Sequence, residues 1–291
     1  MRISDSTLTE DVRVRILKAG AADCGTVRTS ALGNLPALPP VVICAAFSYY
    51  VREDADGSTG KDTEGNRRIP RIARYARGRD YHLELIERLT PAAVYLTEHG
   101  YTARILVDAS PVPEVKAAVL AGIAVRGING LAITREYGSR VFLGCIATDA
   151  PLTCTEHNFE RCIGCGACVR ACPTGALTRE GVDVTRCLSQ ISQKSGALTE
   201  WEARALIETG TLWGCDRCQD VCPMNRDIRE TTIPAFRERL IHTLTADDLR
   251  GLTRRTLSEK YPDRAFTWKG PAPLLRNAEL LENDGGRPCP C

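Results

Sequence analysis

The residues best suited to chemistry are eight cysteines between positions 162 and 222. They are Cys162, Cys165, Cys168, Cys172, Cys187, Cys215, Cys218 and Cys222. The first four follow the pattern Cys-x2-Cys-x2-Cys-x3-Cys-Pro, in which three thiolates face one iron–sulfur cube and the fourth serves a neighbouring cube. Two [4Fe-4S] clusters require eight thiolate ligands, which is the number that this stretch supplies.

We therefore predict two clusters with separate ligand sets. Cys162, Cys165, Cys168 and Cys222 would hold one cluster, and Cys172, Cys187, Cys215 and Cys218 the other. A pair of structural zinc sites fits less well, because zinc motifs rarely carry three cysteines at successive two-residue spacing before Cys-Pro. A disulfide framework fits least, because the spacings are those of metal-bound thiolates and the N-terminus shows no export signal.

The composition limits the class of protein. The chain has 291 residues, 43% of them hydrophobic and 25% charged, with a net charge of +2. These values are ordinary for a soluble globular protein and give no overall attraction to nucleic acid or membrane. No run of eighteen apolar residues is present, so we expect no membrane span. The 14 cysteines suit a reducing compartment, and we expect a cytoplasmic protein.

The elements that must position these residues follow from hydrophobic periodicity. We expect helices at 9–19, 81–99, 112–121 and 244–257, strands at 41–47, 102–107, 131–134 and 140–148, and a loop at 52–68. The mixture predicts an α/β or α+β sheet domain over 1–152. A two-cluster bacterial ferredoxin-like domain would follow over 153–228, and a short helical extension with a frayed tail over 229–291.

Three stretches of the sheet domain could bind a ligand, and each has a plainer structural explanation. Residues 72–82 combine aromatic, guanidinium and imidazole groups that could hold a large cofactor, or they could simply begin a helix capped by Asp80. Asp108 follows a strand, where open sheets bind ligands, but it could be an ordinary N-cap. The small residues of 127–131 and 138–144 allow close backbone approach to a ligand, or they form turns that flank a hairpin.

Taken with the cysteines, these stretches resemble the epoxyqueuosine reductase family, which is related to the catalytic part of reductive dehalogenases. The resemblance covers roughly residues 10–230. It rests on the segments 75–82, 108–111, 138–144, 162–175, 185–187 and 214–226, including the isolated Cys187 that follows an arginine. It implies an α+β fold in which a nitroreductase-like mixed sheet domain precedes the two-cluster domain.

The resemblance also implies cofactors, a reaction and site residues. The family reduces the epoxide of epoxyqueuosine in tRNA with cobalamin and two [4Fe-4S] clusters. Its proton-donating aspartate falls on Asp108, and burial beside an apolar macrocycle would raise the pKa of that carboxyl. The cobalamin pocket would draw on Tyr75, Arg77, Asp80, Tyr81, His82, Asn129, Gly138, Ser139, Cys215 and Asp216. We expect His82 to be a hydrogen-bonding or structural residue rather than a cobalt ligand.

The chain departs from the family pattern in three places, one of which is a short segment between Leu32 and Pro40 where the family often carries a longer loop. Where the family usually reads Trp-Ile-Gly-Lys-Asn, this chain reads Val125-Arg-Gly-Ile-Asn129, without the lysine. Many members also end in a helical-repeat domain that helps to hold tRNA, which we do not expect in this short form. Arg237, Arg239, Arg250, Arg254 and Arg255 could contact phosphates, although a solvated face of mixed charge explains them equally well.

We therefore predict an oxidoreductase, with tRNA and a low-potential electron donor such as a flavodoxin or ferredoxin as partners, acting as a monomer. Two alternatives remain. The first is a reductase with the same cofactors and a small organic substrate. The second is a two-cluster electron carrier without catalysis of its own.

Overall fold

The computed structural model describes residues 5–35, 37–52, 70–108, 110–155 and 161–283. The chain forms two compact units, each assembled from separate segments. Unit 1 comprises 1–50, 81–165 and 222–234, and unit 2 comprises 51–80, 166–221 and 235–291. The loop expected at 52–68 lies almost wholly outside the described residues. The division into three consecutive domains stays a prediction.

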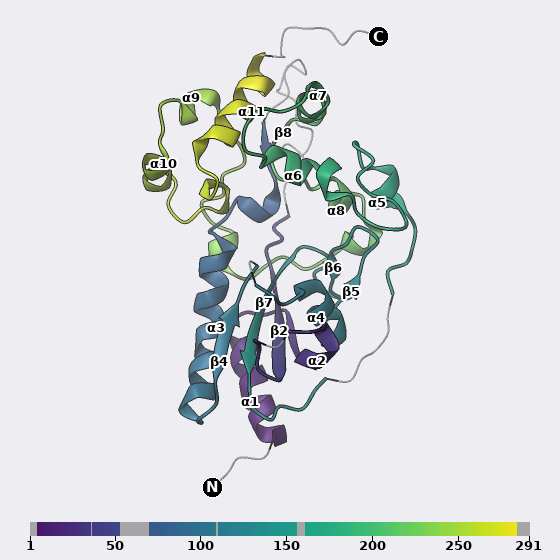
Figure 1. Cartoon of the computed structure of the whole chain (residues 1–291), viewed down its shortest axis with the longest axis vertical. Helices are drawn as coiled ribbons and strands as arrows, with labels where there is room; N and C mark the ends of the chain where they lie inside the picture. The colour runs from purple at the N-terminus through teal and green to yellow at the C-terminus, as the bar shows by residue number, and fades with distance from the viewer. Residues whose placement is uncertain (1–4, 36, 53–69, 109, 156–160, 284–291) are drawn as a thin grey trace. The chain divides into compact units, whose positions relative to one another are not determined.

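Unit 1 is built on a four-stranded sheet (Figure 1). Its order is β1 (Asp23–Arg28), β2 (Val41–Ser48), β7 (Val141–Thr148) and β4 (Ala103–Leu106). All neighbouring strands run antiparallel, with Cys44 opposite Cys145 at the centre of the sheet. This is the mixed α+β architecture predicted from the sequence.

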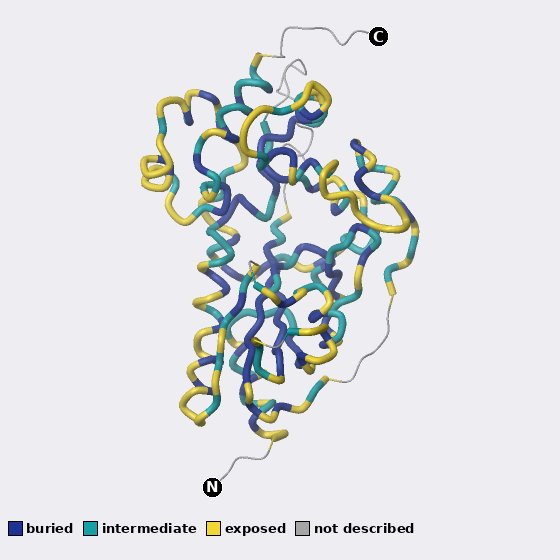
Figure 2. The backbone as a smooth tube through the Cα atoms, in the orientation of Figure 1, coloured by how far each residue is buried: buried dark blue, intermediate teal, exposed yellow. Residues whose placement is uncertain are grey.

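Helices cover both faces of this sheet. Helices α1 (Asp5–Lys18) and α3 (Tyr81–Glu98) pack together on one face, where α3 also contacts β4 and β7. Helices α2 (Thr29–Leu32) and α4 (Glu114–Leu120) pack on the other face, over a core that includes Val42 and Cys145. All eight residues of β2 are buried (Figure 2). The strand therefore reads as a continuous apolar run rather than an alternating one, because neither face meets water.

Residues 127–131 form the turn of a hairpin in unit 1. Strands β5 (Val125–Arg126) and β6 (Ala132–Ile133) pair antiparallel, and the backbone N–H of Gly127 donates to the carbonyl of Leu131 across the turn.

The 3-10 turn η4 (Pro223–Asn225) contributes Asn225, whose side chain bonds to Ser139.

Unit 2 surrounds a two-stranded parallel pair, β3 (Arg71–Ile72) and β8 (Thr211–Trp213). Its α-helices are α5 (Ala167–Arg170), α6 (Leu188–Ser192), α7 (Glu200–Thr209), α8 (Arg217–Asp220), α9 (Ala246–Leu249), α10 (Arg254–Lys260) and α11 (Pro271–Asn283). Its 3-10 turns are η2 (Arg74–Ala76), η3 (Val184–Arg186), η5 (Pro234–Phe236) and η6 (Ala265–Thr267). Helix α11 is tied to α6 and β8 because the fully buried Asn277 amide donates to the carbonyls of Ser192 and Leu212, at 2.8 and 2.9 Å.

Most predicted elements are confirmed, but the single helix at 244–257 is wrong. The chain forms α9 and α10 instead, because Gly251 adopts a left-handed φ of 75° between them. The expected cap at Thr245 is present, with a capping box to Asp248. Within the described part of the chain, no helix is both long and apolar enough to cross a membrane.

Candidate functional site

The predicted cluster ligands of unit 1 interact with one another. Burial raises the pKa of the Cys222 thiol, and the nearby Cys162 and Cys165 raise it further. Gly164 and Gly166 both have φ of 68°, and this left-handed backbone allows the tight turns around Cys165. These three cysteines were assigned to one cluster from spacing alone.

The predicted ligands of unit 2 lie on short helices and turns. Burial raises the pKa of Cys215 to about 12, and Asp216 and Cys187 also raise it. For Cys172, burial raises the pKa, but hydrogen bonds from Thr174 and from nearby backbone N–H groups outweigh it and lower the pKa overall. Helices α5 and α8, which carry Cys168 and Cys218, pack against each other.

The arrangement of the cysteines must be judged differently for an iron–sulfur cluster than for a single metal ion. In the described part of the chain, no three or more Cys, His, Asp or Glu side chains converge as ligands of one metal ion. The thiolates of a cluster instead bind separate corners of a cube, so they are spread farther apart. The ligand sets of the two clusters stay predictions.

Asp108 lies at a short hydrogen-bonded junction with the start of α3. Its Oδ2 accepts a hydrogen bond from the Tyr81 hydroxyl at 2.8 Å and lies 3.2 Å from His82 Nε2. The side chain is 60% exposed, and that of His82 is 37% exposed. Asp108 meets Tyr81 and His82, which lie 27 and 26 positions earlier in the sequence. They meet because α3 packs along β4, the strand that precedes Asp108.

The hydrogen bonds of Asp108 act against the rise in pKa that burial beside a macrocycle would cause, and that rise stays a prediction. The hydrogen bond to His82 is the largest influence and lowers the pKa below its ordinary value, and the bond to Tyr81 lowers it further. Burial acts in the expected direction, upward, but it is the smaller effect because the carboxyl is still largely exposed. The carboxyl is therefore held ionised at neutral pH.

An aromatic stack adjoins this carboxyl. The Tyr81 ring lies parallel to Phe142, with ring centroids 4.5 Å apart and planes 8° apart. It also stacks on His82 at 4.0 Å. Phe142 in turn contacts Tyr49 at 4.5 Å. The result is a set of stacked rings beside the ionised carboxyl of Asp108.

Of the other predicted residues in unit 1, Asn129 and Ser139 belong to separate networks. Asn129 Oδ1 accepts from the Leu131 backbone N–H at 3.3 Å. Its Nδ2 is buried and has no acceptor among the described residues. The Ser139 backbone N–H donates to Asn225 Oδ1 at 2.7 Å, which ties the turn at Gly138 to the segment following Cys222. Asn225 was not singled out as a site residue from the sequence.

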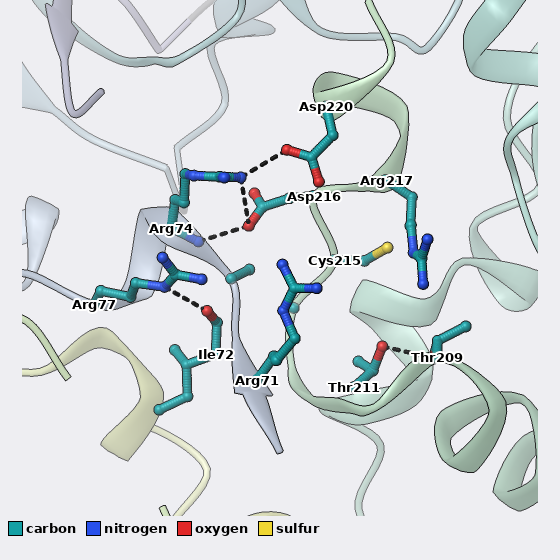
Figure 3. Close-up of a pocket in the computed structure, with 12 residues that line it drawn as sticks. Arg71, Ile72, Arg74, Arg77, Thr209, Thr211, Cys215, Asp216, Arg217 and Asp220 are labelled. Atoms are coloured by element: carbon teal, nitrogen blue, oxygen red, sulfur yellow. Dashed lines mark hydrogen bonds and ion pairs between the residues drawn. The ribbon is translucent and has the colours of Figure 1, made fainter. Parts of the chain in front are cut away.

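Unit 2 brings Arg77, Cys215 and Asp216 to one cavity of about 310 Å³ (Figure 3). Arg74 spans the rim: its guanidinium lies 2.6 Å from Asp220 and 3.7 Å from Asp216, and its backbone N–H donates to Asp216. Arg77 Nε donates to the Ile72 carbonyl at 2.7 Å. The cavity is thus lined by guanidinium groups that carboxylates and carbonyls hold in place.

Two predicted residues of unit 2 do not line this cavity. Tyr75 lies beside it: its hydroxyl accepts from Gln193 Nε2 at 3.2 Å, and its ring packs against Gly214. The Asp80 backbone N–H donates to the carbonyl of Asp263 at 2.7 Å.

Sequence reasoning missed one residue beside Asp108. Glu114 Oε1 accepts a hydrogen bond from the Asp108 backbone N–H at 2.7 Å. The available signal was the six-residue spacing between a carboxylate at a strand end and another at a helix start.

Comparison with known proteins places this geometry in a family. Residues 161–225 match the family model described as "4Fe-4S double cluster binding domain", and residues 37–109 match "Epoxyqueuosine reductase QueG, DUF1730". An epoxyqueuosine reductase of Listeria monocytogenes is 36% identical over 220 residues, covering 72% of this chain and 56% of that protein. One from Synechocystis sp. is 31% identical over 243 residues, covering 82% and 81%.

The structural comparison agrees. A crystal structure of epoxyqueuosine reductase with a tRNA-Tyr epoxyqueuosine-modified stem loop superposes with a TM-score of 0.82 at 26% identity, covering 96% of this chain and 82% of that one. The chain spans little more than half the length of several of the relatives it matches, such as 56% of the Listeria protein.

Proposed function

Because this chain belongs to the epoxyqueuosine reductase family, we propose that it reduces the epoxide of epoxyqueuosine in tRNA, using two [4Fe-4S] clusters and cobalamin. The observation that carries the proposal is the 31% identity with the Synechocystis protein across most of both chains. The tRNA stem loop bound by the similar crystal structure supports tRNA as the substrate class.

The donor set fits the clusters. Cys215 and Cys222 have raised pKa values because their negative charge would be buried beside other thiolates. Iron supplies the positive charge that offsets this repulsion, so such thiols become good ligands on cluster binding. Hydrogen bonds that already lower the pKa of Cys172 favour its thiolate form in the same way.

The residues also fit a corrinoid. The buried Nδ2 of Asn129 is a donor without an acceptor among the described residues. A corrin carries amide oxygens that could accept from such a donor. We infer that the sheet of unit 1 is nitroreductase-like and contributes to this site. Of the other residues that the family resemblance assigns to cobalamin binding, unit 1 carries Tyr81, His82, Gly138 and Ser139, and unit 2 carries Tyr75, Arg77, Asp80, Cys215 and Asp216.

The protein's part in the reaction concerns protons. Conversion of an epoxide to an alkene and water consumes two electrons and two protons. The clusters and cobalamin, when bound, supply the electrons and the reduced nucleophilic centre. Asp108 would protonate the leaving oxygen, and His82 and Tyr81 hold its carboxyl in position.

The remaining proposals concern the binding partners and the cellular compartment. A low-potential flavodoxin or ferredoxin would deliver the electrons, and the protein would act as a monomer in the cytoplasm. The C-terminal arginines could contact tRNA phosphates, and two of them make exposed ion pairs within the chain. Arg250 pairs with Asp247, and Arg255 with Glu259, at 2.5 and 2.8 Å.

The test is anaerobic reconstitution of the full chain, followed by a corrinoid spectrum and turnover of an epoxyqueuosine-containing anticodon stem loop. We expect one cobalamin bound per chain with its lower base displaced, and turnover that Asp108→Asn removes while cobalamin binding persists. Absence of cobalamin binding would favour the electron carrier. Binding without turnover of the stem loop would favour the small-molecule reductase. Undiminished turnover by Asp108→Asn would exclude its role as the acid.

A further inference from the structure

The turn that carries Asp108 is anchored from the side by Glu114. The carboxylate of Glu114 accepts the Asp108 backbone N–H at 2.7 Å. Glu114 is the first residue of α4, and α4 packs on β2 and β7 in the core of unit 1. The anchor is therefore attached to the rigid part of the sheet domain.

The backbone of Asp108 needs such an anchor. Its φ is 56°, in the left-handed region, which is strained for a residue with a side chain. Its carbonyl also accepts from the backbone N–H of Ser110, whose hydroxyl accepts from the Val112 N–H at 3.2 Å. A backbone in this region keeps its conformation only where neighbouring groups hold it.

We propose that Glu114 is a positioning residue, which fixes the Asp108 turn so that the carboxyl of Asp108 stays against Tyr81 and His82. This inference rests on the proposed function, in which Asp108 is the acid. A proton donor must be held close to its target oxygen, and a displacement of about 1 Å can reduce turnover about 100-fold.

The charges around Glu114 make its ionisation depend on whether Asp108 is protonated. Burial raises the pKa of Glu114 to about 7, and the negative charge of Asp108 raises it as well. The bond from the Asp108 backbone and the nearby His82 lower it. From the sheet, the groups that face it are the buried thiols Cys44 and Cys145. Protonation of Asp108 removes one opposing charge and favours ionised Glu114, which is the stronger acceptor.

Two conservative variants separate the bond from the charge. Glu114→Gln keeps the reach of the acceptor oxygen and loses the charge, whereas Glu114→Asp keeps the charge and is one methylene too short. We expect Glu114→Asp to lower kcat about tenfold or more with KM changed less than about twofold. Glu114→Gln should keep kcat within about threefold of the unmodified chain. Glu98→Gln and Glu98→Asp, at the exposed end of α3, are the matched controls.

A second readout does not depend on turnover. Hydrogen–deuterium exchange at the Asp108 amide should be slow in the unmodified chain and in Glu114→Gln, and fast in Glu114→Asp. Any other pattern of exchange or of kcat among the two variants overturns the inference. If the unmodified chain shows no turnover, the proposed function fails, and the exchange rates still decide whether Glu114 holds the turn.

Discussion

Replacement of Gly214 by alanine should destabilise unit 2 more than a backbone effect alone explains. Gly214 precedes the predicted ligand Cys215 and has a left-handed φ of 71°. A Cβ at this position would lie 2.6 Å from the Ala73 Cβ and 2.7 Å from Tyr75 Cε1. Both contacts are closer than carbon atoms tolerate, so the chain around Cys215 or Tyr75 must shift.

Two other glycines of unit 2 separate the backbone contribution to the destabilisation by Gly214→Ala from the packing contribution. Gly181 has no left-handed φ and no neighbour within 4 Å of an added Cβ, so Gly181→Ala should stabilise by about 0.5 kcal/mol through the unfolded chain. Gly196 has φ of 80° and the same open space, so Gly196→Ala should cost about 1–2 kcal/mol relative to Gly181→Ala. Gly214→Ala should cost about 1–3 kcal/mol beyond Gly196→Ala because of overpacking.

Urea unfolding of the anaerobically purified protein, followed by far-UV circular dichroism, measures these differences. With a slope of about 3 kcal/mol per M, the Gly214→Ala midpoint should lie about 0.3–1 M below that of Gly196→Ala. Equal midpoints for these two variants would refute the packing argument. A Gly196→Ala midpoint equal to that of Gly181→Ala would refute the backbone argument.

Three further predictions follow from single residues. Cys215→Ser should lower the iron content from about eight to about four atoms per chain, whereas Cys154→Ser should leave it unchanged, measured by colorimetric iron assay. Glu114→Gln should flatten the pH dependence of stability. The pKa of Glu114 in the folded chain, about 7, exceeds its ordinary value of 4.5, so the stability that this group contributes is fully present below pH 4.5 and is lost as the pH rises through 7. His82→Leu should raise the pKa of Asp108, seen by carboxyl carbon-13 NMR, and thereby weaken the stability that ionised Asp108 contributes above its ordinary pKa.

The sequence predicted best what depends on short spacing or on one buried strand. The eight cysteines and the buried strand β2 are patterns of residues close together in the sequence. The clusters and this strand could therefore be predicted before the fold was known. Strand β1 was missed because its sequence is largely polar. It is stabilised by distant partners, since the Thr26 backbone N–H and hydroxyl bond to Thr155 and Thr153. Its burial thus depends on tertiary contacts.

The direction in which the Asp108 pKa shifts also depends on tertiary contacts and could not be predicted from the sequence. Burial could be anticipated from a role beside a macrocycle, but the opposing bonds from Tyr81 and His82 depend on how α3 lies along β4. The divided helix at 244–257 is a different case. Gly251 was visible in the sequence, and a glycine between two apolar segments was an available signal for two helices.

The lowered pKa of Asp108 constrains how it can serve as an acid. At neutral pH the lowered pKa keeps Asp108 as a carboxylate, so the proton must be acquired when its surroundings change. Its side chain is 60% exposed, and covering it would strengthen the burial effect that already acts upward. His82 Nε2 lies 3.2 Å from Asp108 Oδ2, so a proton can pass between the two side chains. Loss of His82 should therefore shift the pH at which turnover falls, whereas loss of the Glu114 anchor should lower turnover at every pH.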